Sequence, residues 1–283
     1  MSTALNLHTE ARLSVRPLEP SIGAEIGGVD LSQPISDEVR DEIKATLLQY
    51  KVVFFRDQNI DVHQQAAFAS RFGKLYTHPN TSRNEKVASI HKIQAVDFTK
   101  YERERDVNTV EAGYHTDTSW RLVPTWGAVL RAVRIPDVGG DTLWVDAAAA
   151  YDGLSEELKQ RLEGLHVTHD FRPALQRVGL DYPIVAHPVV RVHRETGRKT
   201  LWVNFGMRPY IIGVSLEENR ELLREVLAAY QKPEYQVRFS WRPGSVAFWD
   251  NRAAVHIAIR NYGDFPREME RVLIEDEAAY AHI

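Results

Sequence analysis

Apolar and polar residues follow one another in two kinds of pattern near the start of the chain. Residues 39–50, VRDEIKATLLQY, place apolar side chains at helical spacing behind Ser36, and this pattern predicts a capped helix. The next run, KVVFFRDQ at 51–58, is rich in β-branched and aromatic residues and predicts a buried strand. Residues 63–73, HQQAAFASRFG, predict a second helix that ends at Gly73.

Short strand patterns dominate the rest of the chain. They cover residues 13–18, 86–93, 126–135, 141–147, 187–193, 200–205, 235–241, 242–250, 253–261 and 270–276. Residues 22–34 carry the glycine and proline pattern of turns, and helices are expected over 146–165 and 215–231. A regular β-α-β alternation is missing. The pattern therefore favours a mainly β protein of the α+β class, a double-stranded β-helix (jelly roll) with flanking helices, over a parallel α/β fold.

The domain organisation expected from this pattern is simple. Its 283 residues suit a single domain, 1–283. The polar sequence of residues 1–10 predicts a flexible tail. Residues from about 80 to 113 hold clustered charges and a single strand pattern, and long segments of this kind tend to be active-site loops or lids, although a solvated excursion fits equally well.

Charge and cysteine content narrow the possible functions. The formal net charge of −4 gives no basic field, so we expect no nucleic-acid partner. There are no cysteines, which excludes disulfides, thiolate metal sites and cysteine nucleophiles, and suits a reducing compartment. No apolar run reaches about 18 residues, so neither a signal peptide nor a membrane span is expected. We therefore expect a cytoplasmic protein.

The stretch GYHTDTSW at 113–120 contains a candidate pair of metal ligands. Side chains two residues apart in an extended segment point to one side, so His115 and Asp117 could share an ion. The H-x-D pattern also occurs by chance around ordinary hydrogen-bonded histidines, and a third group is needed. His256 is the best candidate, because a polar ring in the apolar strand AAVHIAIRN needs a partner.

Two imidazoles and a carboxylate leave three coordination positions open, which is the arrangement of non-haem Fe(II) oxygenases. A closed structural zinc site is disfavoured without thiolates, whereas catalytic zinc remains a competitor. Beyond His256, a turn at NYGD could bring Arg267 and Arg271 back toward the site, where two guanidiniums would suggest two anionic ligands. Surface ion pairs with Glu268 and Glu270 are the alternative.

The chain resembles the taurine dioxygenase (TauD/TfdA) family of Fe(II)- and 2-oxoglutarate-dependent oxygenases from LSVRPL to RVLIE. The stretches that carry the resemblance occur in family order: IGAEIGGVDLSQP, VVFFRDQ, RFGKLYTHP, YHTDTSW, GGDTLW, HPVVRVH, LWVNFG, FWDNRAAVHIAI and REMERV. An ordered set of this kind is far more specific than any one motif.

The resemblance implies a role for each candidate residue. His115, Asp117 and His256 match the iron ligands. Thr142 matches the threonine that hydrogen-bonds 2-oxoglutarate, and Arg267 matches the arginine that pairs with its distal carboxylate. The residues that match or replace family positions in the substrate pocket, or lie beside them, are His78, Glu111, Thr118, Trp120, Phe171, Met207 and Arg271.

Some of these positions depart from the taurine pattern. Glu111 replaces an asparagine, Met207 replaces a phenylalanine, and Trp120 takes the place of a smaller aromatic residue, whereas Phe171 is kept. The resemblance still implies a small anionic substrate, since the histidine and arginine that face the anion remain. Candidates are a sulfonate, an alkyl sulfate, or a phenoxy or other carboxylic acid.

The implied reaction is hydroxylation of this substrate by O2 with conversion of 2-oxoglutarate to succinate and CO2. The resemblance also implies dimers or tetramers. Two alternatives remain open at this point: a zinc-dependent hydrolase that uses the same His/Asp/His site, and a non-catalytic jelly-roll protein that binds a ligand.

Overall fold

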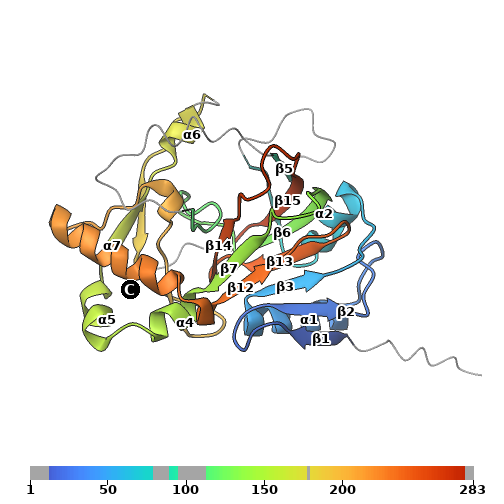
Figure 1. The fold of residues 1–283 in the computed structure, drawn as a ribbon, viewed down its shortest axis with the longest axis horizontal. Coiled ribbons are helices and arrows are strands. Elements are labelled where there is room, and N and C mark those ends of the chain that lie inside the picture. The colour runs from blue at the N-terminus through green and yellow to red at the C-terminus, as the bar shows by residue number, and fades with distance from the viewer. Residues whose placement is uncertain (1–12, 79–88, 95–112, 177–178, 278–283) are drawn as a thin grey trace, which may run out of the picture.

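The computed structural model describes residues 13–78, 89–94, 113–176 and 179–277. Two β-sheets form the centre of the molecule, and helices lie on their outer sides (Figure 1). The predicted tail and most of the predicted loop, residues 79–88 and 95–112, lie outside the described residues. The strand pattern within that loop is confirmed at Ile90–Gln94.

The larger sheet has eight strands in the order β1-β2-β3-β13-β6-β15-β4, with β5 also paired to β15. Its strands are β1 (Ser14–Pro17), β2 (Ala24–Gly27), β3 (Val52–Phe55), β4 (Leu75–Tyr76), β5 (Ile90–Gln94), β6 (Gly127–Arg134), β13 (Val246–Asp250) and β15 (Glu268–Ile274). Neighbours are antiparallel except β2 and β3. Strands distant in the chain, such as β3 and β13, are therefore neighbours in the sheet.

The smaller sheet has three antiparallel strands in the order β12-β7-β14. Its strands are β12 (Gln236–Phe239), β7 (Thr142–Asp146) and β14 (Ala254–Ala258). Two further pairs complete the described strands: β8 (His166–His169) with β9 (Val185–Pro188), and β10 (Val190–Val192) with β11 (Lys199–Leu201). The second pair is a hairpin that overlaps the strand patterns predicted over 187–193 and 200–205.

The helices are short except for α1 and α7. Their bounds are α1 (Asp37–Tyr50), α2 (Val62–Ser70), α4 (Ala147–Asp152), α5 (Glu156–Leu162), α6 (Arg172–Gln176) and α7 (Leu216–Tyr230), with 3₁₀ turns η1 (Phe205–Met207) and η2 (Pro233–Tyr235). Ser36 caps α1 by accepting a hydrogen bond from the backbone N–H of Val39, as the sequence indicates.

Alternation of side chains along the strands explains how these elements form layers. In β3, Val52 and Phe54 pack into the core cluster that also contains Trp144 of the smaller sheet, whereas Val53 and Phe55 pack into the cluster of α1 and α2. The opposite face of the smaller sheet is covered in the same way by α4, α5 and α7. The sandwich between the sheets is the jelly roll predicted from the sequence.

Two local predictions differ from the structure. The helical stretch over 146–165 is divided into α4 and α5, because α4 ends at Gly153 and Ser155 caps a new helix. The segment 22–34, interpreted as turns, contains β2. A strand of four residues is too short to show a clear alternating pattern among glycines.

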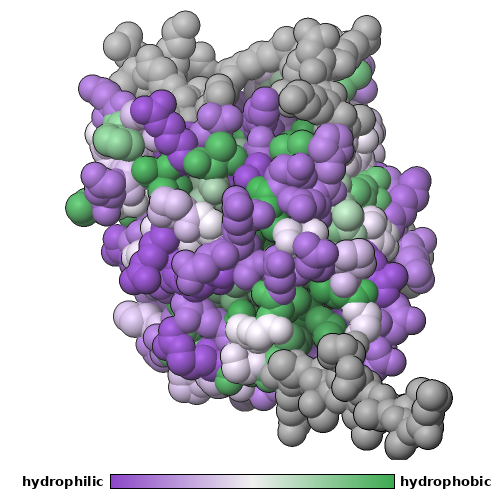
Figure 2. Space-filling model, turned by 90° about the vertical axis from the view of Figure 1, so that its right-hand side faces the viewer, coloured by the Kyte–Doolittle hydropathy of each residue, from purple (hydrophilic) through white to green (hydrophobic). Residues whose placement is uncertain are grey.

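The surface of the molecule fits this layered arrangement. The side that carries β1 and α1 is mostly hydrophilic, with separate apolar patches (Figure 2). Within the part of the chain that the structure describes, none of the helices has the length and apolar character needed to cross a membrane.

Candidate active site

His115 and His256 face each other across an antiparallel bridge that extends the smaller sheet beyond β14. The backbone N–H of each residue donates to the carbonyl oxygen of the other, at 2.9 Å in both directions. Directly opposed residues in such a pair project their side chains from the same face, and the two imidazole centroids lie 4.1 Å apart. The backbone alone therefore brings the two rings together.

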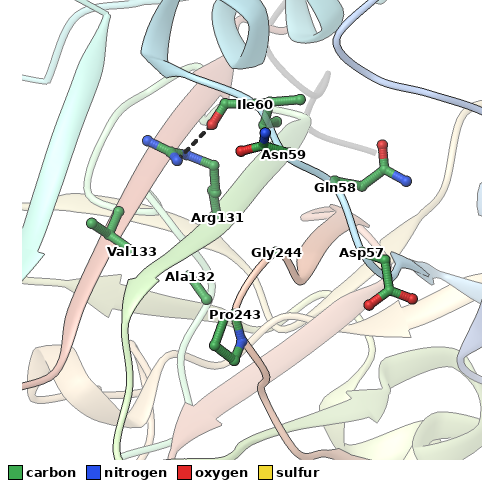
Figure 3. A pocket seen from close by; sticks show the side chains of 9 residues that line it. All are labelled: Asp57, Gln58, Asn59, Ile60, Arg131, Ala132, Val133, Pro243 and Gly244. Carbon is green, nitrogen blue, oxygen red and sulfur yellow. Dashed lines mark hydrogen bonds between the residues drawn. The ribbon is translucent and has the colours of Figure 1, made fainter.

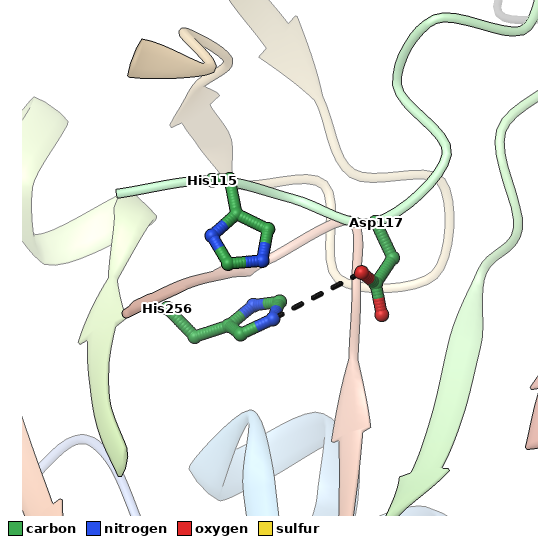
Figure 4. Close-up of side chains that lie close together, drawn as sticks. All are labelled: His115, Asp117 and His256. Atoms are coloured by element: carbon green, nitrogen blue, oxygen red, sulfur yellow. Dashed lines mark ion pairs between the residues drawn. The ribbon is translucent and has the colours of Figure 1, made fainter. Parts of the chain in front are cut away.

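Asp117 completes the cluster from two residues further along the extended segment. Its Oδ1 lies 4.0 Å from His256 Nε2, and one ligand atom from each of the three residues lies within 4.8 Å of the others (Figure 4). The structure confirms the prediction that the side chains of His115 and Asp117 lie on the same side of the extended segment. The chain thus presents two imidazoles and a carboxylate to one point.

The cluster has the properties of a site for a divalent cation. Asp117 Oδ2 is buried and has no hydrogen-bond partner among the described residues. Burial lowers the pKa of both His115 and His256 from the usual histidine value, so both imidazoles are neutral and keep a lone pair for a ligand bond. His115 Nδ1 lies 2.9 Å from the Gly113 carbonyl oxygen, which can only accept, so His115 Nε2 is the ligand atom.

Asn251 fixes the backbone that carries Asp117. Its side-chain oxygen accepts from the Asp117 N–H at 2.8 Å, and its Nδ2 donates to the carbonyls of Asp117 at 2.7 Å and Thr125 at 2.9 Å. Asn204 acts in the same way on the next residues, donating to the Thr116 carbonyl at 3.0 Å. Sequence reasoning missed both asparagines, although each stands at the end of an apolar run, where a buried amide needs partners.

Arg267 and Thr142 lie together beside the cluster. Arg267 Nη2 is 3.5 Å from Thr142 Oγ1, and its Nε donates to the Gly140 carbonyl at 3.0 Å. Only 7% of Arg267 is exposed. Thr142 stands on β7 opposite Ala258, two residues beyond His256 on β14. Arginine remains charged even where burial lowers its pKa, as here, so a buried cation and a hydroxyl adjoin the candidate metal site.

Arg271 projects from β15 toward the same cluster. Its Nη1 lies 2.5 Å from Asp117 Oδ1, and the side chains of the pair are 11% and 5% exposed. The surface ion pair considered for Glu270 does not form with Arg271, because Glu270 binds Arg131 instead. Both arginines therefore return toward His256, as the turn in the sequence suggested.

His78 lies in an aromatic enclosure next to Arg271. The rings of Tyr76, Trp120 and Phe171 surround it at 6.3, 6.3 and 6.4 Å, each nearly perpendicular to it. Burial, followed by the charge of Arg271, lowers the pKa of His78 to about 3. At neutral pH His78 is therefore an uncharged hydrogen-bonding group.

A second histidine, His91, adjoins His78. It lies on β5 opposite Arg271 in the strand register, and its ring is 4.7 Å from that of His78. The polar residues around His91 in the sequence do not indicate this contact, because the contact depends on the pairing between β5 and β15.

The structure shows contacts for some of the other predicted pocket residues but not for all of them. Trp120 stacks on Phe171 with centroids 5.5 Å apart, and the sulfur of Met207 lies 3.5 Å from the Ser119 hydroxyl. Thr118 has a φ of 52°, and its hydroxyl is hydrogen-bonded to the backbone N–H of Thr125 at 2.8 Å. Contact of Thr118 with substrate stays a prediction, and Glu111 lies outside the described residues.

A hollow of about 370 Å³ elsewhere on the larger sheet contains none of these residues. It lies between the end of β3, the middle of β6 and the turn before β13, and Asp57, Arg131 and Pro243 are among its lining residues (Figure 3). Arg131 there donates to the Ile60 carbonyl at 2.7 Å and pairs with Glu270. Its guanidinium is thus engaged in holding β6 to its neighbours.

A two-sheet β core that brings two histidines and one carboxylate together, largely buried, is the arrangement typical of non-haem Fe(II) oxygenases. Comparison with known proteins is consistent with this class. The family model described as taurine catabolism dioxygenase TauD, TfdA family matches residues 14–273. The chain belongs to this family, and the resemblance seen in the sequence is confirmed.

Individual relatives cover nearly the whole chain. The alpha-ketoglutarate-dependent sulfate ester dioxygenase of Pseudomonas putida is 33% identical over 94% of this chain and 90% of its own. The alpha-ketoglutarate-dependent 2,4-dichlorophenoxyacetate dioxygenase of Cupriavidus pinatubonensis is 31% identical over 93% and 97%. A crystal structure of a taurine dioxygenase from Burkholderia xenovorans has a TM-score of 0.81 at 36% identity, covering 94% of this chain and 91% of that one. The protein is therefore a dioxygenase that depends on 2-oxoglutarate, the compound also called alpha-ketoglutarate.

Proposed function

We propose that the protein binds Fe(II) through His115, Asp117 and His256 and uses O2 and 2-oxoglutarate to hydroxylate a small anionic substrate. The observation that carries this proposal is the convergence of the three ligand atoms within 4.8 Å beside a buried arginine. Three protein ligands leave half of an octahedral coordination shell for other molecules. When bound, the ferrous ion supplies the activation of O2 that is coupled to oxidation of 2-oxoglutarate to succinate and CO2.

Arg267 and Thr142 are suited to hold the far carboxylate of 2-oxoglutarate. A guanidinium offers a carboxylate two parallel hydrogen bonds, and burial of Arg267 strengthens them. The Thr142 oxygen already accepts from Trp241 Nε1 at 3.0 Å, so its own proton is left to donate to the carboxylate. A metal-dependent hydrolase would not need Arg267 and Thr142 in this role, because it binds no 2-oxoglutarate.

Arg271 and His78 are suited to hold the anionic group of the substrate. The positive charge of Arg271 lies beside Asp117, so it is within reach of a molecule held near the metal. His78 is neutral at physiological pH and can donate one hydrogen bond to the same anion. The relatives named for sulfate esters, dichlorophenoxyacetate and taurine support an anion as the substrate class.

The products follow from the carbon that is attacked. One oxygen atom of O2 enters the substrate C–H bond as a hydroxyl, and the other enters succinate. Where the hydroxylated carbon also bears a sulfate, sulfonate or aryloxy group, the new hydroxyl loses its proton and becomes a carbonyl oxygen. The C–O or C–S bond to that group breaks at the same time, and the group leaves with the bonding electrons. The expected leaving groups are then sulfate, sulfite or a phenol.

The test uses protein loaded with Fe(II) without oxygen and supplied with 2-oxoglutarate, O2 and a panel of alkyl sulfates, sulfonates and phenoxy acids. We expect succinate in proportion to released sulfate, sulfite or phenol. His115→Ala should abolish succinate formation while its circular dichroism matches the wild type. Succinate formation that survives this substitution, or product release without O2 in the zinc-loaded protein, would overturn the proposal.

A further inference from the structure

We propose that Thr118 is a positioning residue that directs the carboxylate of Asp117 toward the metal, and that its hydroxyl serves this purpose through a hydrogen bond within the protein. This inference rests on the proposed function, because Asp117 is one of the three proposed ligands of the ion. It gives Thr118 a role other than the contact with substrate that the sequence suggested.

Thr118 has a backbone conformation that its residue type rarely adopts. Its φ is 52°, in the left-handed region, where a branched β-carbon crowds the main chain. The backbone N–H of Arg121 donates to the Thr118 carbonyl at 2.9 Å, so the chain turns directly after Asp117. A threonine stays in this region only where its surroundings hold it there, and such positions gather at functional sites. The constrained turn therefore sets the direction in which the chain leaves a proposed metal ligand.

The hydroxyl of Thr118 closes the loop that follows, residues 118–125. Its Oγ1 accepts a hydrogen bond from the backbone N–H of Thr125 at 2.8 Å and lies 2.9 Å from the Thr125 hydroxyl oxygen. Thr118 is 4% exposed and Thr125 is 0% exposed. Removal of the Thr118 hydroxyl would leave the buried N–H of Thr125 without this acceptor, which is costly. One side chain next to the ligand thus joins the two ends of the loop.

The far end of the loop is also tied to Asp117 through Asn251. Its Nδ2 donates to the carbonyls of Thr125 at 2.9 Å and Asp117 at 2.7 Å. Thr125 is therefore held at its N–H by Thr118 and at its carbonyl by Asn251. Asp117 Oδ2 has no hydrogen-bond partner among the described residues, so the direction of this oxygen depends on how the main chain is held. The Thr118 hydroxyl is part of what holds it.

The test compares two substitutions at this one position. Thr118→Val keeps the shape of the side chain and removes the hydroxyl, whereas Thr118→Ser keeps the hydroxyl. We expect Thr118→Val to weaken the affinity for Co(II), measured by titration without oxygen, roughly 10- to 100-fold. The visible absorption spectrum of bound Co(II), which reports the geometry of its ligands, should change as well. Thr118→Ser should retain the affinity and the spectrum of the wild type.

Thr46→Val is the matched control. Thr46 is also buried, at 7% exposure, and its hydroxyl donates to the Glu42 carbonyl at 2.8 Å within α1. This substitution should lower the midpoint of urea unfolding and leave the affinity and spectrum of Co(II) unchanged. If Thr118→Val does not fold, Thr118→Ala removes the same hydroxyl with less crowding at a positive φ and takes its place in the comparison.

Kinetic measurements separate this role from contact with substrate. At saturating Fe(II), Thr118→Val should lower kcat and leave KM for an alkyl sulfate unchanged. Unchanged Co(II) affinity and spectrum in this variant, or a raised KM with unchanged Co(II) affinity, would overturn the inference and leave the dioxygenase proposal intact. A wild-type protein that binds no divalent cation would overturn both.

Discussion

His115 and His256 exchange both of their backbone hydrogen bonds with each other, at 2.9 Å each, so the spacing of two proposed metal ligands is set by the main chain. The imidazoles are additionally packed, with Trp249 4.9 Å from the His256 ring. A site held in this way exists before the metal binds, and exchanging either imidazole should leave the fold intact.

Replacing Arg271 should make stability more dependent on metal. Arg271→Met leaves the buried Asp117 carboxylate without its cation, which costs roughly 3 kcal/mol in the metal-free protein. A bound divalent cation restores the missing charge. The rise in melting temperature on addition of Mn(II) should therefore be larger in the variant than in the wild type.

Arg131→Met is the control for this prediction. It breaks a pair with Glu270 whose side chains are 16% and 6% exposed, but that pair does not contact the cluster. It should lower the melting temperature equally with and without metal. An equal metal-dependent rise in all three proteins would contradict the role given to Arg271.

Asn251 should matter for metal affinity although it is not a ligand. Asn251→Ala removes three hydrogen bonds and leaves buried backbone groups of Asp117 and Thr125 unpaired. We expect the unfolding free energy to fall by about 3 kcal/mol. We also expect the affinity for metal to be roughly 10- to 100-fold weaker. Denaturant unfolding and metal titration measure the two effects.

Asn219→Ala provides the comparison. Asn219 is also buried and accepts from the Ile211 N–H at 2.8 Å, but it lies on α7. It should lower the unfolding free energy and leave metal affinity unchanged. If both variants lowered metal affinity alike, general destabilisation would explain the effect.

His78 should make the protein less stable in mild acid. Its pKa is about 3 in the folded state against 6.5 ordinarily, so between these values the unfolded chain binds a proton that the folded chain does not. Stability therefore falls as the pH falls from 6.5 toward 3, by up to about 1.4 kcal/mol per unit from this group. His78→Phe should be progressively more stable than the wild type in urea unfolding at pH 7, 6 and 5. Parallel curves would refute the depressed pKa.

His91 should position His78 for the substrate anion. His91→Ala removes the ring 4.7 Å from His78, whereas His91→Phe keeps a ring there. We expect the alanine variant to raise KM for an anionic substrate about fivefold or more and the phenylalanine variant about twofold, with KM for 2-oxoglutarate unchanged in both. Equal effects of the two substitutions would show that ring packing is not involved.

Much of the candidate site could be predicted because its information is local. The spacing of His115 and Asp117 places both side chains on one side of an extended segment, and an imidazole in the apolar strand of His256 signals a buried partner. Helix α1 was found from spacing and its serine cap. These features depend only on neighbours in the chain.

The rest depends on contacts between distant segments. The role of Asn251 follows from the approach of Asp117 from the other half of the chain, and that of His91 from the register of β5 on β15. Neither contact can be predicted from the local sequence pattern, because the alternation of apolar and polar residues does not show which strands pair with each other.

β15 comes after all the other described strands of its sheet in the chain, yet it lies between β6 and β4 and also pairs with β5. A growing chain on the ribosome can therefore assemble β1, β2, β3, β13 and β6 before β15 emerges, while β4 and β5 await their partner. The same late strand brings Arg271 to the site, and Arg267 immediately precedes it. During synthesis, the anion-binding half of the catalytic centre should be the last part to form.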